Sequence, residues 1–369
     1  MDADPARVAE RREQSGPAAS CAGAWLQWAP GGDARLFRPE MLMIGATGRN
    51  TGKTELACRV IRHHAARIPI AALKVTAVVR TDGSCPRGGA GCGVCSSLAE
   101  SWCVTRELDA DSDKDTSKLL ASGAREAYWL RVTHEALGEG AAGLLAHVPP
   151  GWPSVCESNS LSRVVEPGLF LQVRTASERT IKPSARAVAD LVDRVVVSDG
   201  SGFDLPLDRV ALLDGQWALQ REACAVVMAD TPPGPSVLAS LRAQFTQVEV
   251  ACVPVRAGEN GGLMRALAIA LTRSVHDWCL VVRAGASSVP AGTVNAMFRR
   301  RAGVEAIVAR EASPCAPEPL VLVHRNLLPR IAGALLEGTA SPAPSLSTLG
   351  KVRELPFSRQ LPAGDSSRC

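Results

Sequence analysis

The sequence predicts an α/β protein that is built from two domains. Short apolar runs typical of strands alternate with segments of helical spacing along most of the 369 residues. This alternation favours mostly parallel sheets that helices cover on both faces. A Gly-rich turn at residues 45–54 separates the first strand pattern from the first helix pattern. A turn at Asp214-Gly215 separates two blocks of this alternation, and the second block starts near residue 222.

The first block, residues 39–215, is the predicted N-terminal domain. Apolar residues 41–44 predict its first strand, and the spacing of Leu56, Val60 and Ile61 predicts a helix over 53–66. The remaining elements are expected as strands at 70–79, 127–132, 155–156, 168–173 and 194–198, and as helices at 117–124, 135–146 and 184–192. Residues 81–104 form a Gly- and Cys-rich insertion, and residues 1–38 are expected to be a loosely ordered leader.

The second block, residues 222–357, predicts another α/β domain with its own core. Strands are expected at 223–229, 248–253, 278–282, 306–310 and 320–324, and helices at 237–245, 262–272, 290–301 and 328–336. The composition of residues 358–369, which is rich in Pro, Gly and Ser, predicts a flexible tail.

Composition and charge exclude several classes of protein. No run approaches the roughly 18–20 apolar residues of a membrane span, although the mean hydropathy is +0.06. The polar N-terminus lacks the apolar core of a signal peptide, so we expect a cytoplasmic protein. The net charge of +4 is small and its cations are scattered, which gives no support for nucleic-acid binding.

The turn at residues 45–54 reads Gly-Ala-Thr-Gly-Arg-Asn-Thr-Gly-Lys-Thr and has the context of a phosphate-binding P-loop. Successive backbone N–H groups of such a turn form an anion nest at a helix N-terminus. Lys53 is predicted to reach the β- and γ-phosphates, and the Thr54 hydroxyl to bind Mg²⁺. The nucleotide-binding residues are predicted to be Thr47, Gly48, Arg49, Asn50, Thr51, Gly52, Lys53 and Thr54. Since Thr47 stands where the usual pattern has Gly, we expect nucleotide binding with slow hydrolysis or none.

Two carboxylates are candidates for the chemistry of this loop. Glu157 follows the apolar pair 155–156, and an acid at the carboxyl end of a strand beside a P-loop binds Mg²⁺ through water. The alternative is an ordinary loop glutamate. Asp115 either lies near the Mg²⁺ and the nucleotide or, like Thr116, caps the helix that follows. The loops containing Lys182 and Asp199 occupy positions where such a sheet binds the base, but the base itself is left open.

Clustered cysteines are the second strong motif. Cys85, Cys92 and Cys95 have C-x6-C-x2-C spacing in a Gly-rich segment, and Cys103 follows eight residues later. Three or four thiolates can bind one zinc ion or one iron–sulfur cluster. The alternative is a loop of free or redox-active thiols. By contrast, Cys58, Cys156, Cys224, Cys252 and Cys279 stand in apolar segments and are expected to be small buried hydrophobes.

The first block resembles a known family. The sequence at 48–54, Lys74, the Lys-Asp-Thr at 114–116, the Ser-Gly-Ala at 122–124 and Glu157 resemble the MobB-type P-loop proteins of molybdopterin-guanine dinucleotide biosynthesis. The resemblance spans roughly residues 40–215. It implies a P-loop NTPase-type three-layer parallel sheet that binds GTP, with Lys53, Glu157 and Asp115 as the residues of its chemistry.

The second block is more faintly similar to the MobA-type nucleotidyltransferases, which attach GMP to molybdopterin. Gly261-Gly262-Leu263 and the strand at 278–282 carry this similarity, which implies a Rossmann-like nucleotidyltransferase-type domain. Two positions depart from that family. Asp230-Thr-Pro-Pro-Gly-Pro stands where a Gly-rich basic loop is expected, and Arg283 where a metal-binding Asp is expected. Without those groups, transition-state charge is not stabilised, so we expect a catalytically silent domain.

Together, these expectations predict an accessory protein of molybdenum cofactor biosynthesis that binds GTP or ATP with Mg²⁺. It would be a weak nucleoside triphosphatase at most. Its expected partners are molybdopterin, transferases of the cofactor and client molybdoenzymes, and a homodimer is compatible with the sequence. Two alternatives stay open, which are a metal- or redox-sensing regulator that uses the cysteine loop and a small-molecule kinase or ligase.

Overall fold

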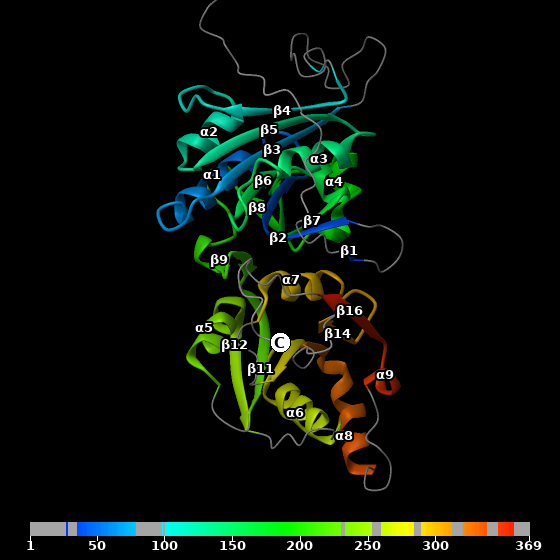
Figure 1. Cartoon of the computed structure of the whole chain (residues 1–369). Helices are drawn as coiled ribbons and strands as arrows, with labels where there is room; N and C mark the ends of the chain where they lie inside the picture. The colour runs from blue at the N-terminus through cyan, green and yellow to red at the C-terminus, as the bar shows by residue number, and fades with distance from the viewer. Residues whose placement is uncertain are drawn as a thin grey trace, which may run out of the picture.

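The protein has a mixed α/β fold in which parallel strand pairs predominate (Figure 1). The computed structural model describes residues 27–28, 35–78, 98, 100–229, 233–252, 260–283, 289–311, 320–337 and 346–357. In this part of the chain the strands form an eight-stranded sheet, a six-stranded sheet and a two-stranded hairpin. Each large sheet has helices and apolar cores on both faces, as alternating strands and helices require.

The first sheet contains the strand that precedes the Gly-rich loop. Its strands are β1 (Gln27–Trp28), β2 (Arg35–Ala46), β3 (Ala71–Val78), β4 (Trp102–Glu107), β5 (Glu126–Thr133), β6 (Ser154–Glu157), β7 (Val165–Thr175) and β8 (Arg194–Ser198). The main order is β4-β5-β3-β6-β2-β7-β8, with β1 beside β2. Only β1 and β4 run antiparallel to their neighbours among these strands. The carboxyl ends of β2, β3, β6 and β7 therefore meet at one edge of the sheet.

Helices cover the two faces of this sheet. They are α1 (Lys53–His64), α2 (Asp115–Ala121), α3 (Leu137–Leu145) and α4 (Pro183–Arg186). The core on one face combines the apolar side of α1 with Leu119 of α2, and the core on the other face contains Leu137 and Leu144 of α3. A hairpin of β9 (Val210–Leu213) and β10 (Gln216–Leu219) closes the α1 face and buries Trp217.

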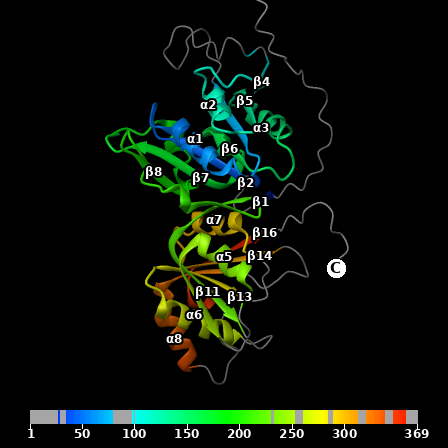
Figure 2. The same cartoon turned by 90° about the vertical axis from the view of Figure 1, so that its left-hand side faces the viewer.

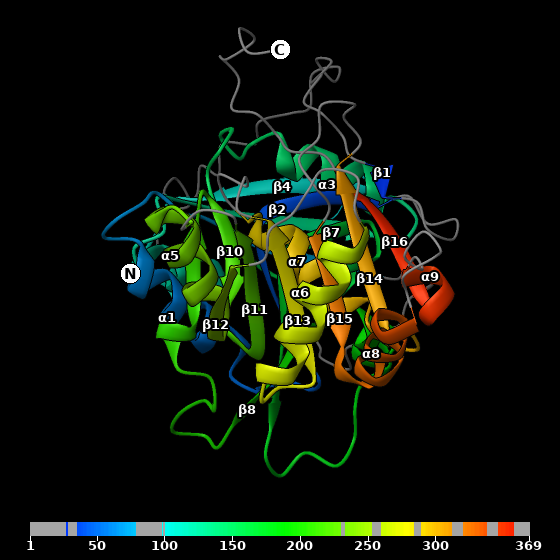
Figure 3. The same cartoon turned by 90° about the horizontal axis from the view of Figure 1, so that it is seen from below.

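The second sheet is formed by the C-terminal part of the chain. Its strands are β11 (Arg221–Ala229), β12 (Phe245–Cys252), β13 (Trp278–Arg283), β14 (Ala306–Glu311), β15 (Leu320–His324) and β16 (Val352–Phe357), in the order β12-β11-β13-β15-β14-β16. Its helices are α5 (Pro235–Gln244), α6 (Asn260–Arg273), α7 (Ala291–Arg299), α8 (Leu328–Glu337) and α9 (Leu346–Leu349). One core includes residues of α5 and α7, and the core on the opposite face includes residues of α6 and α8. Figure 3 shows these helices from below.

Most predicted elements are present, but several boundaries differ. β2 begins at Arg35 rather than at residue 41, so part of the predicted leader is a strand that pairs with β1 and β7. The predicted Cys-rich insertion ends in β4, an edge strand whose half-buried side chains gave no clear alternation. The predicted helix at 184–192 is instead the short α4 and a 3-10 turn. The predicted junction contains the hairpin, and both Asp214 and Gly215 have positive φ at its turn.

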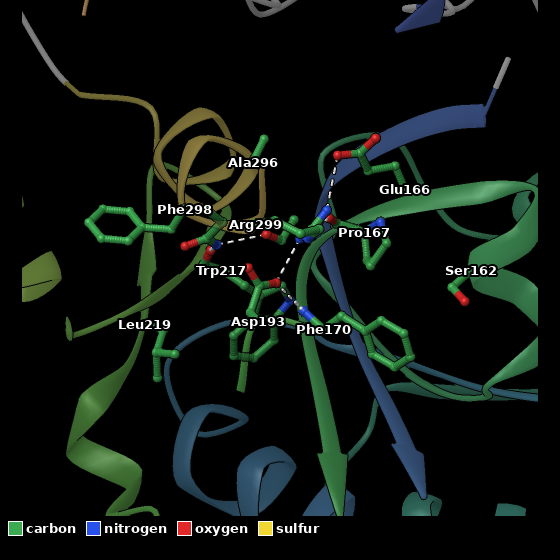
Figure 4. Close-up of polar contacts among 12 residues, drawn as sticks. Ser162, Glu166, Pro167, Phe170, Asp193, Trp217, Leu219, Ala296, Phe298 and Arg299 are labelled. Atoms are coloured by element: carbon green, nitrogen blue, oxygen red, sulfur yellow. Dashed lines mark hydrogen bonds and ion pairs between the residues drawn. The ribbon is translucent and has the colours of Figure 1, made fainter. Parts of the chain in front are cut away.

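Helix α7 connects the two halves of the molecule (Figures 1 and 2). Asn295 of α7 donates hydrogen bonds to the carbonyl oxygens of Gly168 (2.7 Å) and Trp217 (2.8 Å) in the first half. Arg299 lies 3.0 Å from Glu166 and 2.6 Å from Asp193, and Figure 4 shows its guanidinium between the two carboxylates. Because all three charged side chains are almost completely buried, this contact is a specific one rather than a solvated surface pair.

Burial and charge act in opposite directions on the ionisation of this cluster. Burial alone would raise the pKa of Glu166, but hydrogen bonds from Arg300 and the charges of Arg299 and Arg35 hold that pKa below its ordinary value. Burial would lower the pKa of Arg299, and the nearby Asp193 and Glu166 raise it instead. Both Glu166 and Arg299 are therefore ionised at neutral pH.

Among the described helices, none has the combination of length and apolar content that crossing a bilayer requires.

Candidate functional site

The Gly-rich loop connects β2 to α1, as the sequence predicts. The carboxyl half of β2 is buried, and α1 starts at Lys53 immediately after the loop. The loop reaches the helix through two residues of left-handed conformation, Asn50 with φ of 55° and Gly52 with φ of 91°. Glycine adopts this conformation without the steric cost of a Cβ atom, which explains Gly52 at the start of the helix.

Gly45 allows a second loop to approach the backbone of β2. The amide of Asn159 pairs with Ala46 in both directions, since its oxygen accepts from the backbone N–H (2.9 Å) and its nitrogen donates to the carbonyl (2.9 Å). A Cβ atom on Gly45 would overlap that side-chain oxygen. Asn159 thereby fixes the loop that follows β6 against the start of the Gly-rich loop.

Thr47, which replaces the usual glycine, is bound to β7 and to the segment after it. Its backbone N–H donates to Val173 (2.9 Å), and its hydroxyl donates to Val173 and to Glu178. The backbone N–H of Lys182 donates to the carbonyl of Thr47 at 2.9 Å. Thr47 is only 2% exposed, so its side chain supports the base of the loop rather than facing the solvent.

Glu157 lies at the carboxyl end of β6, between the Gly-rich loop and β3. The strand register pairs it with Ile44 of β2 and with Lys74 of β3. Its Oε2 lies 3.5 Å from the Nζ of Lys53 and 3.9 Å from the Nζ of Lys74. The side chain is 0% exposed, and neither carboxylate oxygen accepts a hydrogen bond from a described residue.

Asp115 is the second carboxylate that the fold brings to the loop. It is the first residue of α2, pairs with Lys74, and accepts a hydrogen bond from the Thr54 hydroxyl at 3.3 Å. The alternative role as a helix cap is wrong, because residue 114 occupies the cap position without a side-chain cap hydrogen bond. Thr116 is not a cap either, since it donates to Glu107 at 2.8 Å.

All of the predicted loop residues except Thr47 line a common cavity of about 880 Å³. Its lining comprises Ala46, Gly48, Arg49, Asn50, Thr51, Gly52, Lys53, Thr54, Glu55, Lys74, Val75, Thr76, Asp115, Lys182 and Ser184. The cavity is thus large enough for a small-molecule ligand, and it extends from the loop after β7 to the carboxyl end of β3.

Three side chains in or beside this cavity have oxygen donors that fit a magnesium ion, although Glu157 itself does not line the cavity wall. Mg²⁺ prefers carboxylate, hydroxyl and phosphate oxygens, and usually keeps several waters. The Thr54 hydroxyl, the Asp115 carboxylate and the buried Glu157 carboxylate supply this set of donors. The two oxygens of Glu157 carry the most weight, because this buried carboxylate has no hydrogen-bond donor among the described residues and its compensating charges are the ammonium groups of Lys53 at 3.5 Å and Lys74 at 3.9 Å.

At the other end of the cavity, only one of the two expected base-binding loops lines the wall. Lys182 and Ser184 face the cavity. Asp199 instead organises its own turn, since one carboxylate oxygen accepts from the backbone N–H groups of Ser201 (2.8 Å) and Gly202 (2.7 Å). These hydrogen bonds lower the pKa of Asp199.

The predicted metal site in the cysteine loop falls largely outside the described residues. Cys85, Cys92 and Cys95 lie outside the described residues. Cys103 lies on β4, where its sulfur accepts a hydrogen bond from Arg131 at 3.6 Å. Within the described ranges, no three His, Cys, Asp or Glu side chains are grouped to hold a metal ion. Cys58 and Cys156 are buried, as predicted, and burial raises the pKa of both thiols.

The predicted departures from the nucleotidyltransferase pattern in the C-terminal half fall at or beside segments outside the described residues. Residues 230–232, 253–259 and 284–288, which follow the first strands of the second sheet, lie outside the described residues. Its catalytic silence therefore stays a prediction.

Sequence reasoning missed two contributors to the site. Lys74 entered only through a family resemblance, although a lysine inside a buried strand pattern is itself a signal of an internal ion pair. Glu178, which accepts from the Thr47 hydroxyl, lies in a polar segment without a recognisable pattern.

Comparison with known proteins adds little to this geometry. No family model matches the sequence, and no curated protein matches it. Among solved structures, the chain is similar to the crystal structure of a Mycobacterium tuberculosis Rv0371c homolog from Mycobacterium sp. strain JC1, with 14% identity and a TM-score of 0.24. The match covers 38% of this chain and 88% of that chain. A likeness of this size defines neither the fold nor the function of the protein.

Proposed function

We propose that this protein binds a nucleoside triphosphate, GTP or ATP, together with Mg²⁺ at the Gly-rich loop. One observation carries the proposal. The buried Glu157 carboxylate faces Lys53 of the loop at 3.5 Å and has no hydrogen-bond donor among the described residues. A buried anion beside a phosphate-binding lysine is the arrangement that a nucleotide-bound Mg²⁺ would complete.

The acidic and hydroxyl side chains of the site would bind the metal ion, and its cationic and N–H groups would bind the phosphates. Bound Mg²⁺ would neutralise charge on the phosphates. Thr54, Asp115 and Glu157 would hold the ion directly or through water, and Lys53 would turn from Glu157 to the phosphates. The N–H groups of residues 49–54, at the start of α1, would bind phosphate oxygens. Thr47, whose side chain is bound to β7 and Glu178, would keep the loop shape and favour slow hydrolysis or none.

We further propose that the first sheet belongs to the P-loop NTPase type and the second to the nucleotidyltransferase type. The adjacent parallel placement of β2 and β6 supports the first assignment, because it brings Lys53 and Glu157 together. The antiparallel β15 within an otherwise parallel sheet order is compatible with the second. In this proposal the C-terminal half is catalytically silent and binds a pterin, a nucleotide or a partner.

The cellular role that we propose is that of an accessory protein in molybdenum cofactor biosynthesis, which rests on the resemblance to MobB-type proteins. Molybdopterin, the transferases of the cofactor and client molybdoenzymes are its proposed partners. Native mass spectrometry of the purified protein would test this role by detecting bound nucleotide, metal and pterin together. Nucleotide without any pterin, including after addition of molybdopterin, would contradict the role but leave nucleotide binding intact.

The test of nucleotide binding is the Lys53→Ala variant, compared with wild type by isothermal titration with GTP and with ATP in the presence of Mg²⁺. Loss of the phosphate contacts should weaken the affinity for the preferred nucleotide at least about tenfold, or about 1.4 kcal/mol. Arg62→Ala is the matched control, because Arg62 is an exposed cation of the same helix that does not line the cavity. Equal affinities of wild type and Lys53→Ala would refute the assignment.

A further inference from the structure

Lys74 is the second lysine of the site and shares its carboxylates with Lys53. It lies on β3 and is 20% exposed. Its Nζ pairs with Asp115 and lies 3.9 Å from the same Glu157 oxygen that is 3.5 Å from the Nζ of Lys53. Two ammonium groups therefore neutralise two carboxylates at the end of the cavity where a divalent ion fits.

A bound Mg²⁺ and this arrangement of Lys74 compete for the same oxygens. The ion would contact the carboxylates that Lys74 now pairs with, and like charges at such short range repel strongly. Lys74 has a flexible four-carbon stem and lines the same cavity as Lys53 and Thr54. The anionic group nearest to a displaced Lys74 would be the phosphate at the Mg²⁺ end of the nucleotide.

We propose that Lys74 senses the state of the bound nucleotide. In the empty site it holds Asp115 and Glu157 in place of a divalent ion, and when a Mg²⁺–triphosphate binds it moves to the terminal phosphate. Lys53, at the start of α1, reaches the β-phosphate, which the triphosphate and the diphosphate share. This inference rests on the proposed nucleotide binding and names the regulation of the same site.

The movement of Lys74 away from Asp115 would also affect α2, because Asp115 is the first residue of that helix. Asp115 pairs with Lys74 on one side and accepts from Thr54 on the other. Ser112 of the preceding segment contacts Ser117 of α2 at 2.6 Å, and Thr116 of α2 donates a hydrogen bond to Glu107 of β4. Triphosphate binding would thus change the charge balance at the N-terminus of α2. A diphosphate supplies no terminal γ-phosphate to receive Lys74, so Lys74 would stay on Asp115 and keep Mg²⁺ from that carboxylate.

The other described lysine of the cavity is placed differently. Lys182 donates from its Nζ to the Gly48 carbonyl at 3.4 Å and anchors its backbone to Thr47. These contacts hold Lys182 against the backbone of the Gly-rich loop. Of the two lysines that approach Glu157, Lys74 is the one that also pairs with Asp115.

The experiment measures affinities for GTP, GDP, ATP and ADP with Mg²⁺, and for Mg²⁺ alone, in wild type and in Lys74→Met, Lys74→Arg and Lys118→Met. Lys74→Met should weaken triphosphate binding at least about tenfold and diphosphate binding by less than about twofold. It should also tighten the binding of Mg²⁺ alone, since Asp115 and Glu157 lose a competing cation. Lys74→Arg, which keeps the cation, should retain most of the discrimination. Lys118→Met replaces an exposed lysine of α2 outside the cavity and should change nothing.

The outcomes separate this inference from the function on which it rests. If wild type binds no nucleotide, the proposed function fails and the inference fails with it. If wild type binds both phosphate forms and Lys74→Met leaves the triphosphate-to-diphosphate affinity ratio unchanged, only the inference is overturned. Weaker binding of Mg²⁺ alone to Lys74→Met would also overturn it, because Lys74 would then help the ion rather than replace it.

Discussion

Replacing Arg299 with methionine should leave a buried carboxylate without its main cation at the contact between the two halves of the protein. Arg299 is 2% exposed, and its guanidinium lies 2.6 Å from Asp193, which is 0% exposed, and 3.0 Å from Glu166 (Figure 4). Glu166 would keep Arg300 at 2.6 Å and Arg35 at 3.4 Å. Asp193 would keep only Arg221 at 3.6 Å among the described cations, together with the Phe170 N–H at 2.8 Å.

The size of the effect follows from this imbalance. Breaking a buried ion pair by removing one partner costs about 3–5 kcal/mol, because the remaining charge is left uncompensated in a medium of low polarity. Arg299→Met should lower the free energy of unfolding by about that amount. A second substitution, Asp193→Asn, removes the stranded charge and leaves an oxygen that can still accept from Phe170. The double variant should therefore regain at least about 1 kcal/mol.

Urea unfolding followed by tryptophan fluorescence is a suitable assay, because Trp217 lies at this contact and donates to Ser154 at 3.0 Å. The control is Arg310→Met, which removes a pair with Glu354 whose side chains are 59% and 70% exposed. An exposed pair of this kind contributes about 0–1 kcal/mol. A loss below about 1 kcal/mol in Arg299→Met, or a further loss when Asp193→Asn is added, would refute the reasoning.

Two more predictions concern the first half of the protein. Burial, with the charge of His63 in addition, lowers the pKa of His64 to about 4, whereas the unfolded chain has an ordinary value of about 6.5. As the pH falls, the unfolded state thus binds the proton first. The contribution of neutral His64 to the free energy of unfolding is complete above pH 6.5 and is lost as the pH falls towards 4, by about 3 kcal/mol at most. The free energy of urea unfolding should therefore depend less on pH in His64→Gln than in wild type, and an equal pH dependence in the two proteins would contradict this. Gly45→Ala should lower the free energy of unfolding by about 1–3 kcal/mol, because its Cβ displaces Asn159 and its two buried hydrogen bonds. In Gly138→Ala the new Cβ meets no atom within 4 Å, so this control should be neutral or slightly stabilising in thermal melts, and equal losses in the two variants would argue against the Asn159 contact.

Local patterns predicted the Gly-rich loop and its flanking elements well. The apolar run of β2, the helical spacing of α1 and the Gly52-Lys53-Thr54 sequence are contiguous in the chain, so their geometry depends on near neighbours. The predicted position of Glu157 beside the loop is confirmed for a related reason, because a residue at the carboxyl end of a parallel strand reaches the same sheet edge as the loop. Strands at the edges of the first sheet were harder to predict from the sequence. The side chains of β4 are mostly half-buried, and β1 has only 2 residues. In both strands, pairing with a strand distant in the sequence decides the conformation, rather than a local pattern.

The sequence by itself determined the α/β alternation, the position of the Gly-rich loop and the residues that line it. These follow from periodicity and from backbone preferences, which act over a few residues. Only the tertiary structure decided that Lys74 competes for Asp115 and Glu157, that Glu178 holds Thr47, and that Arg299 joins the two halves. Each of these contacts joins residues that are far apart in the chain. Their partners are selected by strand order, burial and charge compensation, which exist only once the sheets have formed.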